Sequence, residues 1–176
     1  MSLLTTLENT NQRLALRSLG LGLIAGMRSW TAPAAVAFSY DNAPKDAGWR
    51  KWPIFSSKGA RLVWLFFGVN EYVMDKWPRT IPRIQLKPQM THTDGGILGR
   101  SGVAALAGAA IGTEYDEENG AAIGAALAFG ASFISNYIFY WVRKAMWQNS
   151  KLHDFTVAMI EDQLCVGMAT AVARSA

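Results

Sequence analysis

The sequence predicts an all-α fold, a helical integral membrane bundle of four to five membrane segments that forms a single domain over residues 1–176. Charged residues make up 17% of the chain, against roughly 25% in an ordinary soluble domain, and they are segregated rather than spread. Residues 120–142 contain no Asp, Glu, Lys or Arg. At about 1.5 Å per residue, such a run crosses a hydrocarbon core about 30 Å thick. The mean hydropathy of +0.10 therefore averages apolar segments with polar loops.

Composition excludes two other classes of protein. A single cysteine cannot form a disulfide scaffold, and the apolar content is too high for a disordered chain. The remaining alternative is a soluble bundle of buried hydrophobic helices, whose outside needs polar faces. Residues 120–142 offer no polar face, only Ser132, Ser135 and Asn136, so the membrane protein is favoured.

The first segment covers residues 13–40 and follows a mostly polar cap or interfacial stretch at 1–12. Pro33 has no N–H to donate to the carbonyl four residues earlier, so we expect a kink or break between Arg28 and Pro33. At membrane depth such a break survives only where protein or water satisfies the backbone. A cleaved signal peptide is the alternative, but Arg28 interrupts the apolar run and Glu8 lies where a signal is basic.

Four further segments follow, at about 60–77, 95–113, 120–143 and 152–173. The loop before them, residues 41–60, places Trp beside Arg and Lys, which is typical of a membrane–water interface. A basic, Pro-rich loop joins the second and third segments, and an acidic loop joins the third and fourth.

A pentapeptide occurs twice, as Gly108–Gly112 and Gly120–Gly124, on either side of the acidic loop. Small residues four apart form a flat stripe that lets two helix backbones approach closely. We expect Gly108, Gly112, Gly120 and Gly124 to pack a tight Gly/Ala-rich antiparallel hairpin over residues 95–143, or a dimer seam. A narrow pore lined by these glycines is the alternative.

The distribution of basic residues predicts orientation only by a small margin. If the five segments alternate, one side carries nine basic residues: Arg13, Arg17, Lys76, Arg79, Arg83, Lys87, Arg143, Lys144 and Lys151. The other carries six: Lys45, Arg50, Lys51, Lys58, Arg61 and Arg174. The positive-inside rule then places the N-terminus in the cytoplasm. The two counts are nearly balanced. This is also expected if the first or second segment is re-entrant, or if the protein inserts into the membrane in both orientations.

Ionisable residues in apolar segments are costly to bury and are functional hypotheses by default. Counting those at segment ends, they are Arg28, Glu71, Asp75, Lys76, Arg100, Asp154, Glu161 and Asp162. Glu71 and Asp75 share a helix face, so their carboxylates repel unless one binds a proton, a cation or water. Asp154 and Glu161 share a face as well. Three interpretations stay open: buried ion pairs that fix helix packing, a proton or cation pathway, and a catalytic or divalent-metal site.

Two further patterns in the sequence say less about the possible function than the ionisable residues do. Arg28 and Arg100 each follow a Gly-containing stretch and precede a serine, which suggests a degenerate internal repeat of the kind found in transporters with inverted halves. His92 and His153 each stand near an aspartate, but far apart and without a recognised ligand spacing. We therefore expect no metal and no other cofactor.

The chain lacks a P-loop, a dinucleotide-binding glycine fingerprint, an H-E-x-x-H motif and a G-x-S-x-G motif. Its net charge of +4 comes from basic residues in short loops beside Trp. This placement predicts contact with anionic lipid headgroups rather than with nucleic acid.

Four motifs together span most of the chain. They are Gly26-x-Arg28-Ser29 with Ala32-Pro33-Ala34, Glu71-x-x-x-Asp75-Lys76-x-Pro78 with Pro82-Arg83, the Gly/Ala hairpin after Arg100, and Glu161-Asp162. In these motifs, the second being the most specific, the sequence resembles a family of small bacterial integral membrane proteins known only as a domain of unknown function. The resemblance implies a polytopic helical membrane protein and supplies no activity.

The first functional hypothesis is a small multi-pass transporter or channel of the inner (plasma) membrane. In it the carboxylates and arginines handle a proton, a cation or a small ionic solute. The second, less favoured, is a membrane enzyme whose carboxylates hold a divalent metal and whose arginines hold a lipid phosphate. The third is a non-catalytic scaffold. Expected partners are membrane lipids, a small ion or solute, and further copies of the chain in a homo-oligomer.

Overall fold

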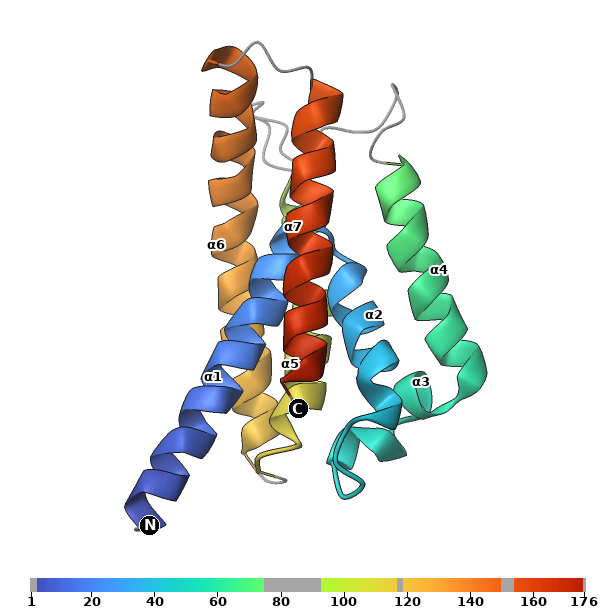
Figure 1. Ribbon diagram of the computed structural model, residues 1–176, viewed down its shortest axis with the longest axis vertical. Coiled ribbons are helices and arrows are strands. Elements are labelled where there is room, and N and C mark those ends of the chain that lie inside the picture. The colour runs from blue at the N-terminus through green and yellow to red at the C-terminus, as the bar shows by residue number, and fades with distance from the viewer. Residues whose placement is uncertain (1–2, 75–92, 117–118, 150–153, 176) are drawn as a thin grey trace.

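The computed structural model describes residues 3–74, 93–116, 119–149 and 154–175. Every regular element among them is helical, which confirms the all-α prediction (Figure 1). In chain order the elements are α1 (Leu3–Met27), α2 (Thr31–Phe38), η1 (Ser39–Asp41), η2 (Gly48–Lys51), α3 (Pro53–Ser56), α4 (Lys58–Met74), α5 (Thr93–Gly112), α6 (Gly120–Asn149) and α7 (Asp154–Arg174). The elements η1 and η2 are short 3-10 turns.

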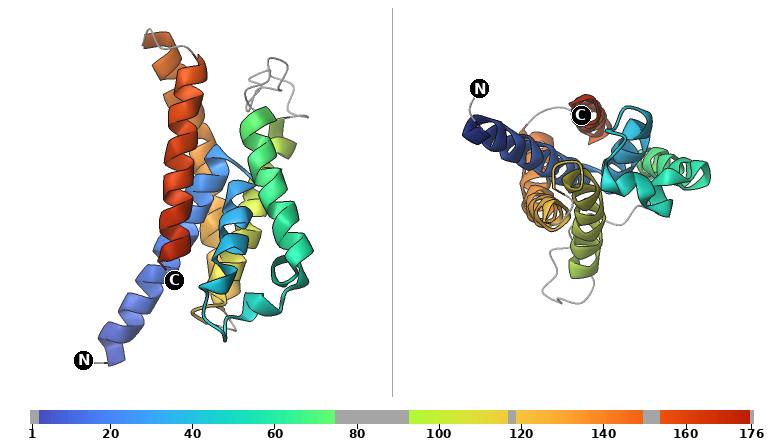
Figure 2. Two further views of the ribbon diagram at one scale, coloured as in Figure 1. Left: turned by 45° about the vertical axis from the view of Figure 1, so that its right-hand side comes forward. Right: turned by 90° about the horizontal axis from the view of Figure 1, so that it is seen from below.

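Helices α1 and α2 form an antiparallel helical hairpin instead of one continuous segment over residues 13–40. After α1 ends at Met27, residues 28–30 turn the chain, and α2 runs back toward the end of the bundle at which α1 began (Figures 1 and 2). The predicted break is present, but it reverses the chain rather than kinking it. Pro33 falls in the first turn of α2, where a helix needs no N–H from that residue. Residues 3–12 are part of α1 and do not form a separate polar cap.

The reversal decides which connections share an end of the bundle. The start of α1, the η1–α3 connection, the turn between α5 and α6, and the end of α7 all lie at one end, here called the terminal end (Figure 1). The count of nine basic residues against six assumed that the five segments alternate. The start of α1 and the connection from η1 to α3 lie at the same end of the bundle, so the two groups in that count do not correspond to its two ends. The orientation predicted from the count loses its basis.

The core of the bundle is formed by α1, α5 and α6, which pack against one another, while α2 lies among α4, α5 and α7. Glycines allow the closest approaches. A Cβ on Gly108 would lie 2.2 Å from the carbonyl oxygen of Gly124, and one on Gly112 would lie 1.9 Å from that of Gly120. The structure therefore places the four expected packing glycines at the α5–α6 contact, where no larger residue fits.

Large apolar side chains cover the outward faces of α4, α6 and α7. They include Leu62, Phe66 and Val73 on α4, Ile134, Ile138 and Trp141 on α6, and Ile160, Leu164 and Val166 on α7. By length and composition, one helix in the described part of the chain can cross a membrane, over residues 120–142. Residues 96–112 form a shorter apolar helix.

Candidate functional site at the α1–α2 break

The break lies where α1 meets α6 most tightly. A Cβ built on Gly26 would lie 1.5 Å from the Oγ of Ser135, so this contact requires glycine. The turn itself is held by the N–H of Arg28, which donates to the carbonyl of Ile24 (2.7 Å), and by the N–H of Thr31, which donates to the carbonyl of Arg28 (3.2 Å). The chain thus ends one helix and begins another inside the bundle.

A carboxylate from α4 caps the N-terminus of α2. Oε1 of Glu71 accepts the backbone N–H of Ser29 and Oε2 accepts that of Trp30, both at 2.9 Å. Trp30 precedes α2 but its side chain makes no cap, so Glu71 acts as the capping residue from a distant helix. A negative charge here also interacts favourably with the positive end of the helix dipole. Nη2 of Arg100 on α5 lies 4.0 Å from Oε1 of the same carboxylate.

Arg28 links the other side of the break to α7. Its side chain is 1% exposed. Nε donates to Oδ1 of Asp162 at 2.9 Å, and Nη2 donates to the same oxygen. Nη1 lies 4.0 Å from Oε2 of Glu161 and donates to the carbonyl of Met27, the last residue of α1. A cation at the C-terminal end of a helix is again favourable for the dipole, so both helix ends at the break meet a side chain of the suitable charge.

A hollow of about 450 Å³ adjoins this cluster and lies between α2, α4 and α7. Its walls are mostly apolar and include Ala34, Ala35, Leu65, Gly68, Val69 and Val166. At the end nearer the break, Oγ1 of Thr31 donates to the hydroxyl of Tyr72 at 3.0 Å, and the ring centroid of Tyr72 lies 5.6 Å from Cζ of Arg28. The hollow, here called the lateral groove, therefore runs from an apolar face to the edge of the charged cluster.

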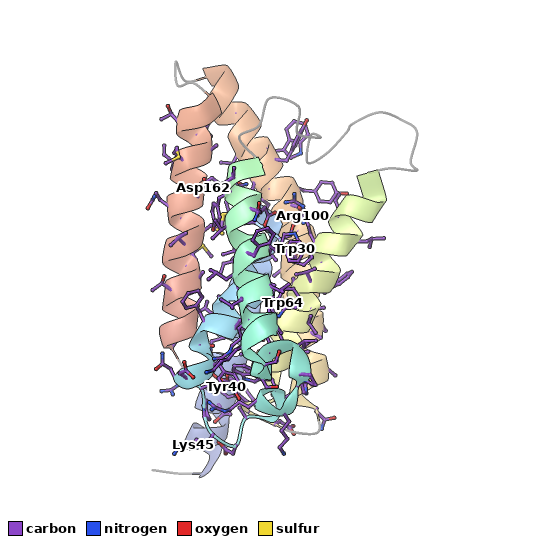
Figure 3. The ribbon with its side chains drawn as sticks, turned by 90° about the vertical axis from the view of Figure 1, so that its right-hand side faces the viewer. Trp30, Tyr40, Lys45, Trp64, Arg100 and Asp162 are labelled. Carbon is purple, nitrogen blue, oxygen red and sulfur yellow. The ribbon has the colours of Figure 1, made fainter. Side chains whose placement is uncertain are left out.

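Five of the eight predicted ionisable residues come together at the break. They are Arg28, Glu71, Arg100, Glu161 and Asp162. Figure 3 shows Asp162, Arg100 and Trp30 in the same part of the bundle, away from the end that carries Tyr40 and Lys45. Asp75, Lys76, His92, His153 and the side chain of Asp154 lie outside the described residues.

The two arginines of the predicted internal repeat pair reciprocally, which a two-fold repeat also allows, but their local structures differ. Arg28 pairs with Asp162 and Arg100 with Glu71, so each arginine meets an acid from the other half of the chain. Helix α5 runs through Arg100 without a break, unlike the chain at Arg28. Among the described residues, no group of three or more His, Cys, Asp or Glu side chains is placed to hold a metal ion.

A second buried ion pair, at the terminal end, was missed from the sequence. Arg17 on α1 pairs with Glu114, and their side chains are 4% and 2% exposed. The indole N–H of Trp49 donates to the other oxygen of Glu114 at 2.9 Å, and Nη1 of Arg17 donates to the hydroxyl of Tyr115 at 3.0 Å. An alternating order of segments places Arg17 and Glu114 on opposite sides, because it treats residues 13–40 as a full crossing. One feature of the sequence could have indicated the pair: Arg17 lies inside the predicted segment 13–40, where a buried arginine needs an acidic partner.

Comparison with known proteins assigns neither a family nor a function to the chain. The chain matches no protein-family model, no curated protein and no solved structure. The resemblance to a family of small membrane proteins therefore stays a prediction.

Proposed function

We propose that the protein is a small multi-pass transporter or channel of the inner (plasma) membrane, and that the charged cluster at the α1–α2 break is its site for a proton, a cation or a small ionic solute. The observation that carries the proposal is the meeting of two helix ends inside the bundle, with Glu71 at one and Arg28 at the other. Broken helices whose ends meet charged groups are a common design of ion and solute sites in membranes. They persist there because protein groups satisfy the exposed backbone.

The surface of the bundle supports a membrane setting. The best apolar window of α6 has only 28% of its residues buried, whereas the apolar helix of a soluble core is mostly buried. Outward side chains such as Phe66 (63% exposed), Leu164 (55%) and Trp141 (53%) lie on three helices. Soluble monomers rarely expose contiguous apolar patches of such extent, so lipid is the better solvent for these faces. Gly99 and Gly102 of α5 have open space beside them, which suits contact with another copy.

The cluster also offers a way to couple ion binding to a change of structure. One guanidinium, that of Arg28, lies within 4.0 Å of carboxylate oxygens from both Glu161 and Asp162. A proton or cation that binds one of these carboxylates competes with Arg28 for it. Ion binding is therefore linked to how firmly the break is held against α7, because a ligand shifts an equilibrium by its differential affinity for the two states.

The test is flux across liposomes that contain the purified full-length protein, measured for protons, alkali cations and small anions. The Arg28→Met/Asp162→Leu variant removes both charges of the hydrogen-bonded pair, and we expect it to lower flux at least tenfold. The matched control is Arg17→Met/Glu114→Leu, which removes a buried pair at the terminal end and should retain flux. No flux above that of protein-free liposomes across the panel would overturn the transport proposal, as would an equal loss in both variants.

A scaffold role is the second candidate, because all five described charges of the cluster lie within 4.0 Å of an opposite charge or are capped by backbone. Such pairs join the break to α4, α5 and α7 and could serve assembly alone. The scaffold predicts no flux for any solute and loss of the assembled state in the Arg28→Met/Asp162→Leu variant. The lipid-phosphate enzyme stays a third alternative: the described residues form no group of three or more His, Cys, Asp or Glu placed to hold a metal ion, and Asp75 and the side chain of Asp154 lie outside them.

A further inference from the structure

We propose that the lateral groove and the basic residues at its terminal end form a binding site for one anionic phospholipid. In this site the headgroup phosphate lies on Lys58 and Arg61, and one acyl chain lies along α4 in the groove. The proposal rests on the membrane setting proposed above, but not on transport.

The apolar part of the site is the groove itself. Its volume of about 450 Å³ is within the usual range for ligand sites, roughly 300–1,000 Å³. The groove is continuous with the outward apolar surface, since the lining residues Phe38, Val69 and Val166 are 67%, 54% and 48% exposed. In a bilayer this surface faces hydrocarbon, so the occupant of the groove is an acyl chain rather than water.

The basic part of the site adjoins the groove at the terminal end. A second hollow, of about 350 Å³, shares Phe38 and Leu65 with the groove and is also lined by Lys58, Arg61 and Asp41. The two basic side chains outnumber the one acid, so the hollow carries a net positive charge. Lys58 is exposed and Arg61 is 22% exposed, so both remain accessible to a headgroup.

Arg61 is held in place by its neighbours. Its Cζ lies 4.4 Å from the ring centroid of Tyr40, whose ring also lies 4.3 Å from Cζ of Arg50. Nη1 of Arg61 lies 3.6 Å from Oδ1 of Asp41, which is itself 85% exposed. A guanidinium that stacks on an aromatic ring is partly ordered before a ligand arrives, and its remaining N–H groups suit the oxygens of a phosphate.

The two parts are in register along one face of α4. Arg61, Leu65, Val69 and Tyr72 are three or four residues apart, so they lie on the same side of the helix. At about 1.5 Å per residue, this face extends roughly 16 Å from Arg61 to Tyr72. Positive charge at one end of an apolar channel is the pattern that matches an anionic lipid, which has a charged end and a hydrocarbon end.

The test is lipid binding to the purified full-length protein in detergent, measured by native mass spectrometry during titration with phosphatidylglycerol or phosphatidylcholine. We expect phosphatidylglycerol to bind about 10- to 30-fold more tightly, in keeping with two basic side chains at the headgroup. The Lys58→Gln/Arg61→Gln variant should lose this preference. Lys45→Gln/Lys51→Gln removes the same charge from the terminal end of the bundle and should keep the preference.

The groove is tested by Val166→Trp, which fills it from the rim, against Leu164→Trp on the same helix outside the groove. We expect only Val166→Trp to weaken phosphatidylglycerol binding, by about tenfold. Both positions are about half exposed, so neither change disturbs the core. Equal affinity of the wild type for the two lipids would overturn the proposal, and so would equal effects of the test and control variants. Full competition by inorganic phosphate, together with no effect of Val166→Trp, would show a free-anion site and overturn it too. None of these results depends on flux, so the transport proposal stands or falls separately.

Discussion

Replacing Glu71 by alanine should destabilise the protein because it uncaps the start of α2. The carboxylate accepts two backbone N–H groups, those of Ser29 and Trp30, and is 13% exposed. A buried donor left without an acceptor costs about 1–3 kcal/mol, so two such donors cost roughly 4 kcal/mol. For a chain of this size about 1 kcal/mol corresponds to about 2–4 °C in Tm. We therefore expect Glu71→Ala to melt roughly 8–16 °C below the wild type. Glu71→Gln keeps one acceptor oxygen and should lose about half as much.

The measurement is thermal unfolding in detergent, followed by circular dichroism. Asn70→Ala is the matched control, because Asn70 is the preceding residue on α4 and its side chain only donates to the carbonyl of Phe66 within the same helix. That variant should change stability by less than about 1 kcal/mol. If Glu71→Ala melted within about 2 °C of the wild type, water would be satisfying the two N–H groups, and the cap that Glu71 supplies to α2 would contribute little to stability, which would refute this reasoning.

Three further outcomes follow from contacts elsewhere in the bundle. Arg28→Met should cost about 3–5 kcal/mol because it removes the guanidinium that donates to the buried carboxylate of Asp162, and adding Asp162→Leu should recover part of that loss; strictly additive losses in unfolding experiments would contradict the pairing. Gly22→Ala should destabilise by about 1–3 kcal/mol, since its Cβ would lie 2.4 Å from the carbonyl oxygen of Ala128. Gly130→Ala, with open space around it, should instead stabilise by about 0.5–1 kcal/mol; the reverse order of Tm values would refute the α1–α6 contact. Cys165 is 0% exposed, so a maleimide should label it only after denaturation, and labelling of the folded protein would show a different packing of α7.

The sequence contains the positions of the helices but not the direction of the chain after the break. Pro33 and the glycines before it predict that the first segment is interrupted. Residues 13–40 are long enough either for one crossing or for two half-helices, and local propensity does not distinguish them. Burial decides between the two courses of the chain. Thr31–Ala37 are all buried, and α2 contacts α4, α5 and α7 only because the chain runs back after the break. That information lies in tertiary contacts.

The candidate site could be predicted in composition but not in pairing. Burial cost marked Arg28, Glu71 and Asp162 among the eight candidate residues, and the structure brings these three to the α1–α2 break. Which acid meets which arginine depends on how helices that are distant in sequence are positioned along one another. Close glycine contacts, such as that of Gly26 with Ser135, fix these relative positions. The Arg17–Glu114 pair was missed for the same reason, since its two ends meet only after the chain has reversed.

The reversal of the chain between α1 and α2 determines which connections share one side of the membrane, and labelling of single cysteines from either side measures this. In a Cys165→Ala background, Gln12→Cys, Lys45→Cys, Asn119→Cys and Ala145→Cys each place one thiol at an exposed position. Sealed membrane vesicles are then treated with a membrane-impermeant maleimide. We expect the first three variants to be labelled from one side and the Ala145→Cys variant from the other. Labelling of the Gln12→Cys and Lys45→Cys variants from opposite sides would show instead that residues 13–40 cross the membrane, and that α1 and α2 do not form a hairpin in the bilayer.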